Sequence, residues 1–256
     1  MGELGWVVGA RPQGRGEGSG QYKGRPYNLR LHRKPPRLYG TMKHLVRLLL
    51  ALAAVGLSLN ASAQNAQAGE KKAAMCIGCH GIPDYKASFP EIYRVPMLAG
   101  QNEKYIASAL AQYKKGDRKH PTMRAIAASL SDQDMADLAA FYANEAKVSP
   151  AAETPGVAPS AEVAELLKKG NCASCHGANF SKPIDPSYPK LAGQHNDYLY
   201  AALREYQTDK NPQVGRNNAI MMGMARPFTH AEAKQLANYL AALPGELKTV
   251  PQSRFR

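Results

Sequence analysis

Cysteine and tryptophan are scarce in this sequence of 256 residues, which has only four cysteines and one tryptophan. No segment alternates apolar and polar residues as a half-buried β-strand does, so we expect no substantial β-sheet. The apolar run at residues 48–59 is too short for a transmembrane helix, which needs ~20 apolar residues. These absences favour an all-α protein whose few cysteines have a specific role.

All four cysteines belong to two copies of Cys-x-x-Cys-His, at residues 76–80 and 172–176. This motif is the attachment signature of c-type haem. Two thiols three positions apart on one helical turn are placed to bond the two vinyl groups of a porphyrin, and the adjacent imidazole is placed to bind the iron. We therefore expect two haem c groups as cofactors. The expected attachment residues and proximal iron ligands are Cys76, Cys79, His80, Cys172, Cys175 and His176.

Three other uses of paired cysteines were weighed against haem attachment. Zinc also binds Cys-x-x-Cys pairs, but these pairs lie 96 residues apart, and zinc gives no reason for a histidine directly after each pair. Redox-active disulfides usually occur among alternating strands and helices, which this sequence does not show. Buried structural disulfides are the third alternative.

The net charge of +13 is concentrated near the N-terminus. Residues 1–41 have eight Lys/Arg against two acids, a balance of +6, and residues 42–63 add two Lys/Arg without an acid. That leaves +5 for residues 64–256, which the propionates of two haems would lower further. A nucleic-acid partner would depend on the first 41 residues alone, and we expect none.

The N-terminal part of the chain predicts export. Residues 1–41 are rich in Gly, Pro and Arg without hydrophobic periodicity, and we interpret them as a disordered extension from an upstream start assignment. Residues 42–63 have the basic start, apolar run and Ala61-Ser62-Ala63 site of a signal peptide. Cleavage after Ala68 and retention as an uncleaved membrane anchor are the alternatives. Since c-type haem is attached beyond the cytoplasmic membrane, we expect a periplasmic protein.

The rest of the chain is a tandem repeat. A Pro-x-Leu-Ala-Gly-Gln block begins at Pro96 after the first haem motif and at Pro189 after the second, and a tyrosine follows each block at Tyr105 and Tyr198. Such self-similarity indicates one duplicated domain. The predicted domains are residues 64–147 and 161–250, and a Pro- and Ala-rich linker occupies residues 148–160.

Each predicted domain has helical periodicity throughout. Capping boxes begin the last helix of each domain, at Ser131 and at Thr229. The other predicted helices are residues 69–79 and 161–175, which lead into the haem motifs, and residues 103–115 and 198–208.

The second axial ligand of each iron is expected to be a methionine, which gives a closed site suited to electron transfer. Aligning the last helices of the two copies without a gap brings Met123 onto Met221, and we predict these two as ligands. Met222 and Met224 are neighbouring alternatives in the second copy. Met97 aligns with Lys190, so it cannot have a role common to both copies; for Met75, Met97 and Met135 we expect core packing. His120, His195 and His230 do not repeat at matching positions, and we interpret them as surface or loop residues.

These motifs together resemble the di-haem cytochrome c4 family, and each half is similar to a class I cytochrome c. The resemblance implies a fold of two tandem helical domains, each wrapped around one covalently attached haem. It also implies that the carbonyls of Pro96 and Pro189 accept the proximal histidine N–H, and that Leu98 and Leu191 pack on the haem. Tyr105 and Tyr198 would hydrogen-bond propionates or pack in the core. One departure is Gly69, expected at a close helix contact, because Glu165 or a neighbour occupies the equivalent position.

The resemblance further implies an electron-transfer protein rather than an enzyme, without catalytic residues or a small-molecule substrate. It would be soluble or loosely membrane-attached, and would carry electrons in a respiratory chain from a cytochrome bc complex or a dehydrogenase to a terminal oxidase. One alternative is a permanent electron-transfer subunit of an oxidoreductase complex. The other is a di-haem peroxidase, which needs one accessible iron.

Overall fold

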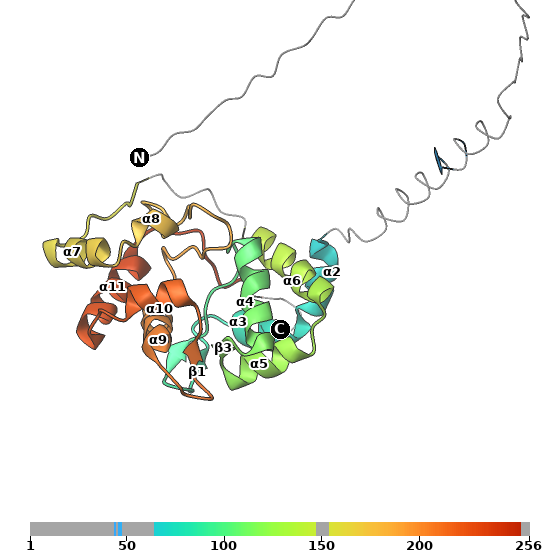
Figure 1. Cartoon of the computed structure of the whole chain (residues 1–256), viewed down its shortest axis with the longest axis horizontal. Helices are drawn as coiled ribbons and strands as arrows, with labels where there is room; N and C mark the ends of the chain where they lie inside the picture. The colour runs from blue at the N-terminus through green and yellow to red at the C-terminus, as the bar shows by residue number, and fades with distance from the viewer. Residues whose placement is uncertain (1–43, 45, 48–63, 147–153, 252–256) are drawn as a thin grey trace, which may run out of the picture. The chain divides into compact units, whose positions relative to one another are not determined.

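The computed structural model describes residues 44, 46–47, 64–146 and 154–251 (Figure 1). The N-terminal extension, most of the predicted signal peptide and residues 148–153 of the predicted linker lie outside these residues. In the part of the chain that is described, no helix is both long and apolar enough to cross a membrane.

The two halves repeat the same five-helix order. In the first half these helices are α2 (Ala66–Lys72), α3 (Ala74–His80), α4 (Glu103–Lys115), α5 (Pro121–Ala128) and α6 (Asp132–Glu145). In the second half they are α7 (Ala161–Lys169), α8 (Ala173–His176), α9 (Asn196–Gln207), α10 (Ala219–Ala225) and α11 (His230–Ala242). The all-α, tandem prediction is confirmed (Figure 1). The helix expected at residues 69–79 is divided at Ala73, and the one expected at residues 161–175 is divided at residues 170–172.

Four two-residue strands also occur, which the sequence pattern did not predict because alternation needs a longer segment. Strands β1 (Lys86–Ala87) and β2 (Tyr93–Arg94) pair within the first half. Strands β3 (Arg118–Lys119) and β4 (Gly215–Arg216) pair antiparallel across the boundary between the halves, with Arg118 opposite Arg216. The two halves therefore share backbone hydrogen bonds at β3 and β4.

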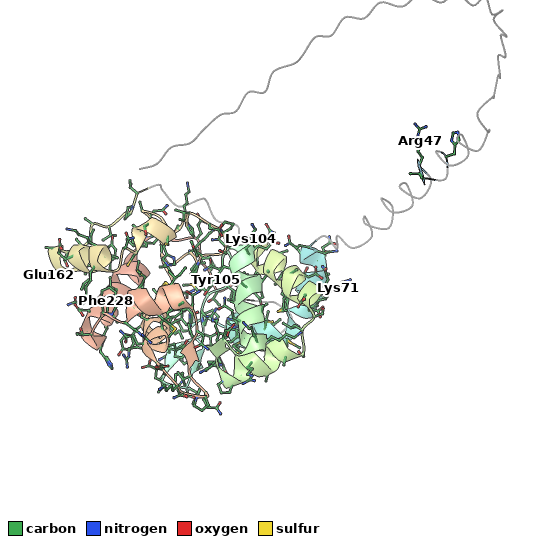
Figure 2. All side chains as sticks on the ribbon, in the orientation of Figure 1. Arg47, Lys71, Lys104, Tyr105, Glu162 and Phe228 are labelled. Carbon is green, nitrogen blue, oxygen red and sulfur yellow. The ribbon has the colours of Figure 1, made fainter. Side chains whose placement is uncertain are left out.

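Each half has its own apolar core, built around its last helix. Leu138 of α6 lies in the first core, and Leu240 of α11 lies in the second. Figure 2 shows Tyr105 among the helices, whereas Lys71 and Glu162 lie at the edge of the fold and are exposed. Both predicted capping boxes are present. The side chains of Ser131 and Thr229 each accept the backbone N–H three residues later, and the carboxylate of that later residue accepts the backbone N–H of the cap.

The first helix of each half meets the last helix differently. A Cβ atom on Gly69 would lie 2.0 Å from the carbonyl oxygen of Asp137, so only glycine allows α2 to approach α6 this closely. Glu165 of α7 is exposed, and Leu166 of the same helix packs against Leu236 of α11. The second half thus replaces a backbone contact by side-chain packing.

The start of α2 is fixed by hydrogen bonds to the buried carboxylate of Asp137. The side chain of Asn65 caps α2, and its backbone N–H donates to Asp137 Oδ1 at 2.9 Å. Lys72 donates to Asp137 Oδ2 at 2.7 Å and holds the pKa of this carboxyl below its ordinary value. The folded domain therefore includes residues from position 65 onward.

Candidate haem-binding sites

Short helices end at the two motif histidines, and a proline carbonyl holds each ring. His80 is the last residue of α3, with Nδ1 2.9 Å from the carbonyl oxygen of Pro96. His176 is the last residue of α8, with Nδ1 3.0 Å from the carbonyl oxygen of Pro189. Because a carbonyl only accepts, Nδ1 carries the proton and Nε2 keeps its lone pair for a metal. Burial lowers the pKa of both rings, which favours this neutral form.

The motif cysteines and histidines of both halves line one cavity of about 660 Å³. All four cysteines are free thiols. Burial raises the pKa of Cys76 and of Cys172 to about 11, so these two sulfurs are protonated at neutral pH before any haem is attached. Within the described residues, no group of three or more His, Cys, Asp or Glu side chains could hold a metal ion, so the pairs lack the further ligands that zinc needs.

Met123 and Met221 occupy equivalent positions, each the third residue of a short helix that lines the cavity. Helix α5 is capped by His120, whose Nδ1 lies 3.3 Å from the backbone nitrogen of Met123. Helix α10 is capped by Asn218, whose Oδ1 accepts the backbone N–H of Met221 at 3.0 Å. Both methionines line the cavity and are half-buried.

The other residues considered as sixth ligands differ in their surroundings. Met222 is not among the cavity-lining residues, and Met224 lines the cavity but is 41% exposed. His120, interpreted from the sequence as a surface or loop residue, lies in the loop directly before α5, where it caps this helix and also lines the cavity. His195 and His230 do not line the cavity.

The family model described as Cytochrome c matches residues 66–144 and 160–244. The chain is 32% identical to "Cytochrome c4" of Azotobacter vinelandii, over 78% of this chain and 99% of that protein. The chain belongs to the cytochrome c4 family. Two haem c groups follow from this membership and from the two motifs, and they make the protein a di-haem electron carrier.

The chain is also similar to a solved cytochrome c4 structure and to an electron acceptor of another name. The solved structure of cytochrome c4 from Acidithiobacillus ferrooxidans has a TM-score of 0.50 and 25% identity, and covers 67% of this chain and 99% of its own. A "Thiosulfate dehydrogenase electron acceptor" of Stutzerimonas stutzeri (strain A1501) is 33% identical, over 78% of this chain and 96% of that protein.

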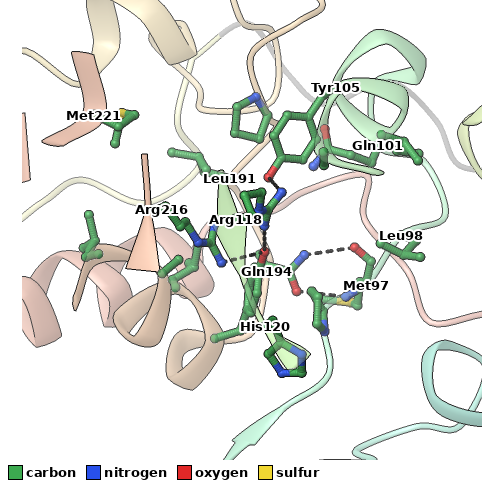
Figure 3. A pocket seen from close by; sticks show the side chains of 18 of the residues that line it. Met97, Leu98, Gln101, Tyr105, Arg118, His120, Leu191, Gln194, Arg216 and Met221 are labelled. Atoms are coloured by element: carbon green, nitrogen blue, oxygen red, sulfur yellow. Dashed lines mark hydrogen bonds between the residues drawn. The ribbon is translucent and has the colours of Figure 1, made fainter. Parts of the chain in front are cut away.

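Two buried arginines in this cytochrome c4 were missed by sequence reasoning. Arg118 and Arg216 are each 5% exposed and lie opposite each other in β3 and β4 (Figure 3). Arg118 donates to the hydroxyls of Tyr105 at 3.3 Å and Tyr198 at 3.2 Å, and Arg216 donates to Tyr198 at 3.4 Å. Arg216 also pairs with the buried carboxylate of Glu205. The spacing of 98 residues, shared with Met123 and Met221, could have identified the two arginines as equivalent.

The charge of Arg118 and Arg216 indicates what kind of group the cavity suits. Among the described residues, Arg118 forms no ion pair, and its buried Nε has no hydrogen-bond partner. Two buried guanidinium groups beside a single carboxylate leave one positive charge that is not neutralised, and such a charge destabilises the fold unless an anion lies nearby. Leu98 and Leu191 contribute apolar walls to the cavity. An apolar ring with carboxylate substituents fits both features.

Proposed function

We propose that this cytochrome c4 carries electrons in the periplasm from a cytochrome bc complex or a dehydrogenase to a terminal oxidase. The observation that carries the proposal is the equivalent position of Met123 and Met221, each at the third residue of a capped helix in the cavity wall. With His80 and His176 as proximal ligands, Met123 and Met221 would hold the second axial position of each haem and close both irons. A closed iron favours a carrier over a di-haem peroxidase.

In this proposal the haem supplies a one-electron couple between ferric and ferrous iron, and the chain controls its surroundings. The carbonyls of Pro96 and Pro189 orient the imidazole rings and raise their basicity. The apolar walls at Leu98 and Leu191 exclude water. Arg118 and Arg216, with Tyr105 and Tyr198, stabilise negative charge at the boundary between the halves.

Partner docking is proposed at the apolar rim of the cavity in the first half. Met75, for which the sequence predicted core packing, is instead 50% exposed. Tyr85 and Phe89 are each 42% exposed, and all three side chains line the cavity. Exposed apolar side chains beside a redox site are typical of a protein-interaction surface. A donor of the thiosulfate dehydrogenase type is a specific candidate, because a relative is described as its electron acceptor.

The docking proposal predicts that Met75→Lys lowers the second-order rate of reduction by a purified donor by about tenfold, because the lysine charge must be desolvated at the contact. Stopped-flow absorption at several ionic strengths measures this rate with cytochrome bc complex or thiosulfate dehydrogenase as donor. Ile184→Lys is the matched control, because Ile184 is 71% exposed and does not line the cavity. Equal rates for both variants would contradict docking at this rim. Co-elution with a membrane complex at nanomolar concentration would favour a permanent subunit.

The periplasmic location is proposed from the signal peptide expected at residues 42–63, with cleavage after Ala63. This cleavage retains Asn65, which caps α2 and donates to Asp137, whereas cleavage after Ala68 would remove it. N-terminal sequencing of the exported protein is expected to begin at Gln64. A mature protein that begins at Gly69, or one that retains residues 42–63, would contradict the proposal.

A further inference from the structure

The two glutamines that end the repeated blocks, Gln101 and Gln194, bond across the boundary between the halves. They are 5% and 3% exposed. Gln194 Oε1 accepts the backbone N–H of Met97 at 3.1 Å, and Gln194 Nε2 donates to the carbonyl of Met97 at 3.0 Å (Figure 3). Gln101 makes the same two bonds to the backbone of Lys190, at 2.8 Å and 3.0 Å. Because both glutamines bind backbone, the different side chains of Met97 and Lys190 do not disturb the pattern.

The orientation of each glutamine amide is fixed by a third hydrogen bond within its own half. Gln101 Oε1 also accepts the N–H of Asn102 at 2.9 Å, and Gln194 Oε1 also accepts the N–H of His195 at 3.0 Å. Each Oε1 therefore receives two donors, and each Nε2 faces a carbonyl. A flipped amide would lose all three bonds.

The N–H that each glutamine accepts belongs to the peptide group that also holds a proximal histidine. The carbonyl of Pro96 and the N–H of Met97 are one peptide group, which accepts from His80 at 2.9 Å and donates to Gln194 at 3.1 Å. The carbonyl of Pro189 and the N–H of Lys190 likewise join His176 to Gln101. A continuous hydrogen-bonded chain thus runs from each motif histidine into the opposite half.

We propose that each glutamine tunes the haem of the opposite half through this peptide group. Donation by a peptide N–H polarises the group and makes its carbonyl a stronger acceptor. A stronger acceptor for the Nδ1–H raises the basicity of the imidazole ligand, which favours ferric iron and lowers the reduction potential. Gln194 therefore acts on the first haem and Gln101 on the second. This inference rests on the proposed assignment of His80 and His176 as proximal ligands.

The test replaces Gln194 by leucine in the full-length holoprotein and measures each haem separately by NMR during a redox titration. We expect the ferric-to-ferrous equilibrium of the first haem to change by about twofold in favour of ferrous iron. This corresponds to an increase of about 18 mV, at ~59 mV per tenfold for one electron. The second haem should keep its potential, and Gln101→Leu should reverse the two responses. Gln194→Asn, too short to reach Met97, should give the same shift if the leucine variant does not fold.

The matched control is Asn102→Ala. Asn102 Nδ2 donates across the same boundary to the carbonyl of Tyr188 at 2.9 Å, but that peptide group holds no histidine. In the reduced protein, the Nδ1–H resonance of His80 should move upfield in Gln194→Leu. That of His176 should move upfield in Gln101→Leu and stay in place in Asn102→Ala. Unchanged resonances, or equal shifts of both haems, would overturn the proposal. If His80 were not a ligand, its resonance would lack the haem ring-current shift in the unmodified protein as well, which separates the two failures.

Discussion

Replacing Met123 with leucine should open the first iron to carbon monoxide while the second iron stays closed. Leucine has a similar volume but no sulfur lone pair, so the variant loses a ligand without a large change in packing. About half of the total haem should then respond, since only one of two irons is open, and its potential should fall because methionine ligation raises it. Absorption spectra of the reduced protein before and after addition of carbon monoxide measure the response. The unmodified protein should show none.

The second half offers a sharper version of the same experiment, because three methionines lie close together there. Met221→Leu should open the second iron, since Met221 is the third residue of its helix, as Met123 is, and its backbone N–H likewise bonds the helix cap. Met222→Leu and Met224→Leu serve as controls and should leave the spectrum insensitive to carbon monoxide. A response in either control, or in the unmodified protein, would refute the ligand assignment and favour an enzyme with an accessible iron.

Replacing Arg216 with methionine should lower the free energy of unfolding of the holoprotein by about 3–5 kcal/mol, because it leaves the buried carboxylate of Glu205 without its partner. Glu205→Gln should also be destabilising, since it removes the carboxylate that pairs with the buried guanidinium of Arg216. Glutamine is chosen because Gln112 of the first half occupies the position equivalent to Glu205. Urea unfolding followed by circular dichroism measures both variants.

The double variant Arg216→Met/Glu205→Gln distinguishes a buried ion pair from two independent contributions. We expect the double variant to lose clearly less free energy of unfolding than the sum of the two single losses. The reason is that removing both groups leaves neither the guanidinium nor the carboxylate without its partner. Lys169→Met is a control on an exposed ion pair, that of Lys169 with Glu232, and should cost less than about 1 kcal/mol. Additive single losses would show that Arg216 and Glu205 do not stabilise each other.

The sequence was sufficient to predict the features that are formed within one half. The cysteine motifs, the capping boxes at Ser131 and Thr229, and the apolar faces of the long helices depend on residues close together in the chain, so their spacing predicts them. Helices α5 and α10 were missed because each is short and has no long apolar face. His120 is also an unusual cap, which concealed the start of α5.

Contacts between the halves could not be predicted in the same way. Alignment of the two copies indicates that Gln101 and Gln194 are equivalent, but equivalence does not say that each one binds the backbone of the other half. The pairing of Arg118 with Arg216 across β3 and β4 has the same origin, because a two-residue strand has no periodicity to detect. The residues at the boundary therefore acquire their roles only when both copies are folded together.

The contacts of Gln101 and Gln194 join two parts of one polypeptide, since residues 147–153 connect Ala146 to Thr154. A short tether gives each half an effective concentration on the order of millimolar for the other. A contact of only micromolar affinity would then be closed about a thousand times more often than open. The boundary can therefore consist of polar groups such as glutamines and arginines, without the large apolar area that a dimer of separate chains would need. Dilution, which dissociates such a dimer, leaves the two haem sites of this chain together.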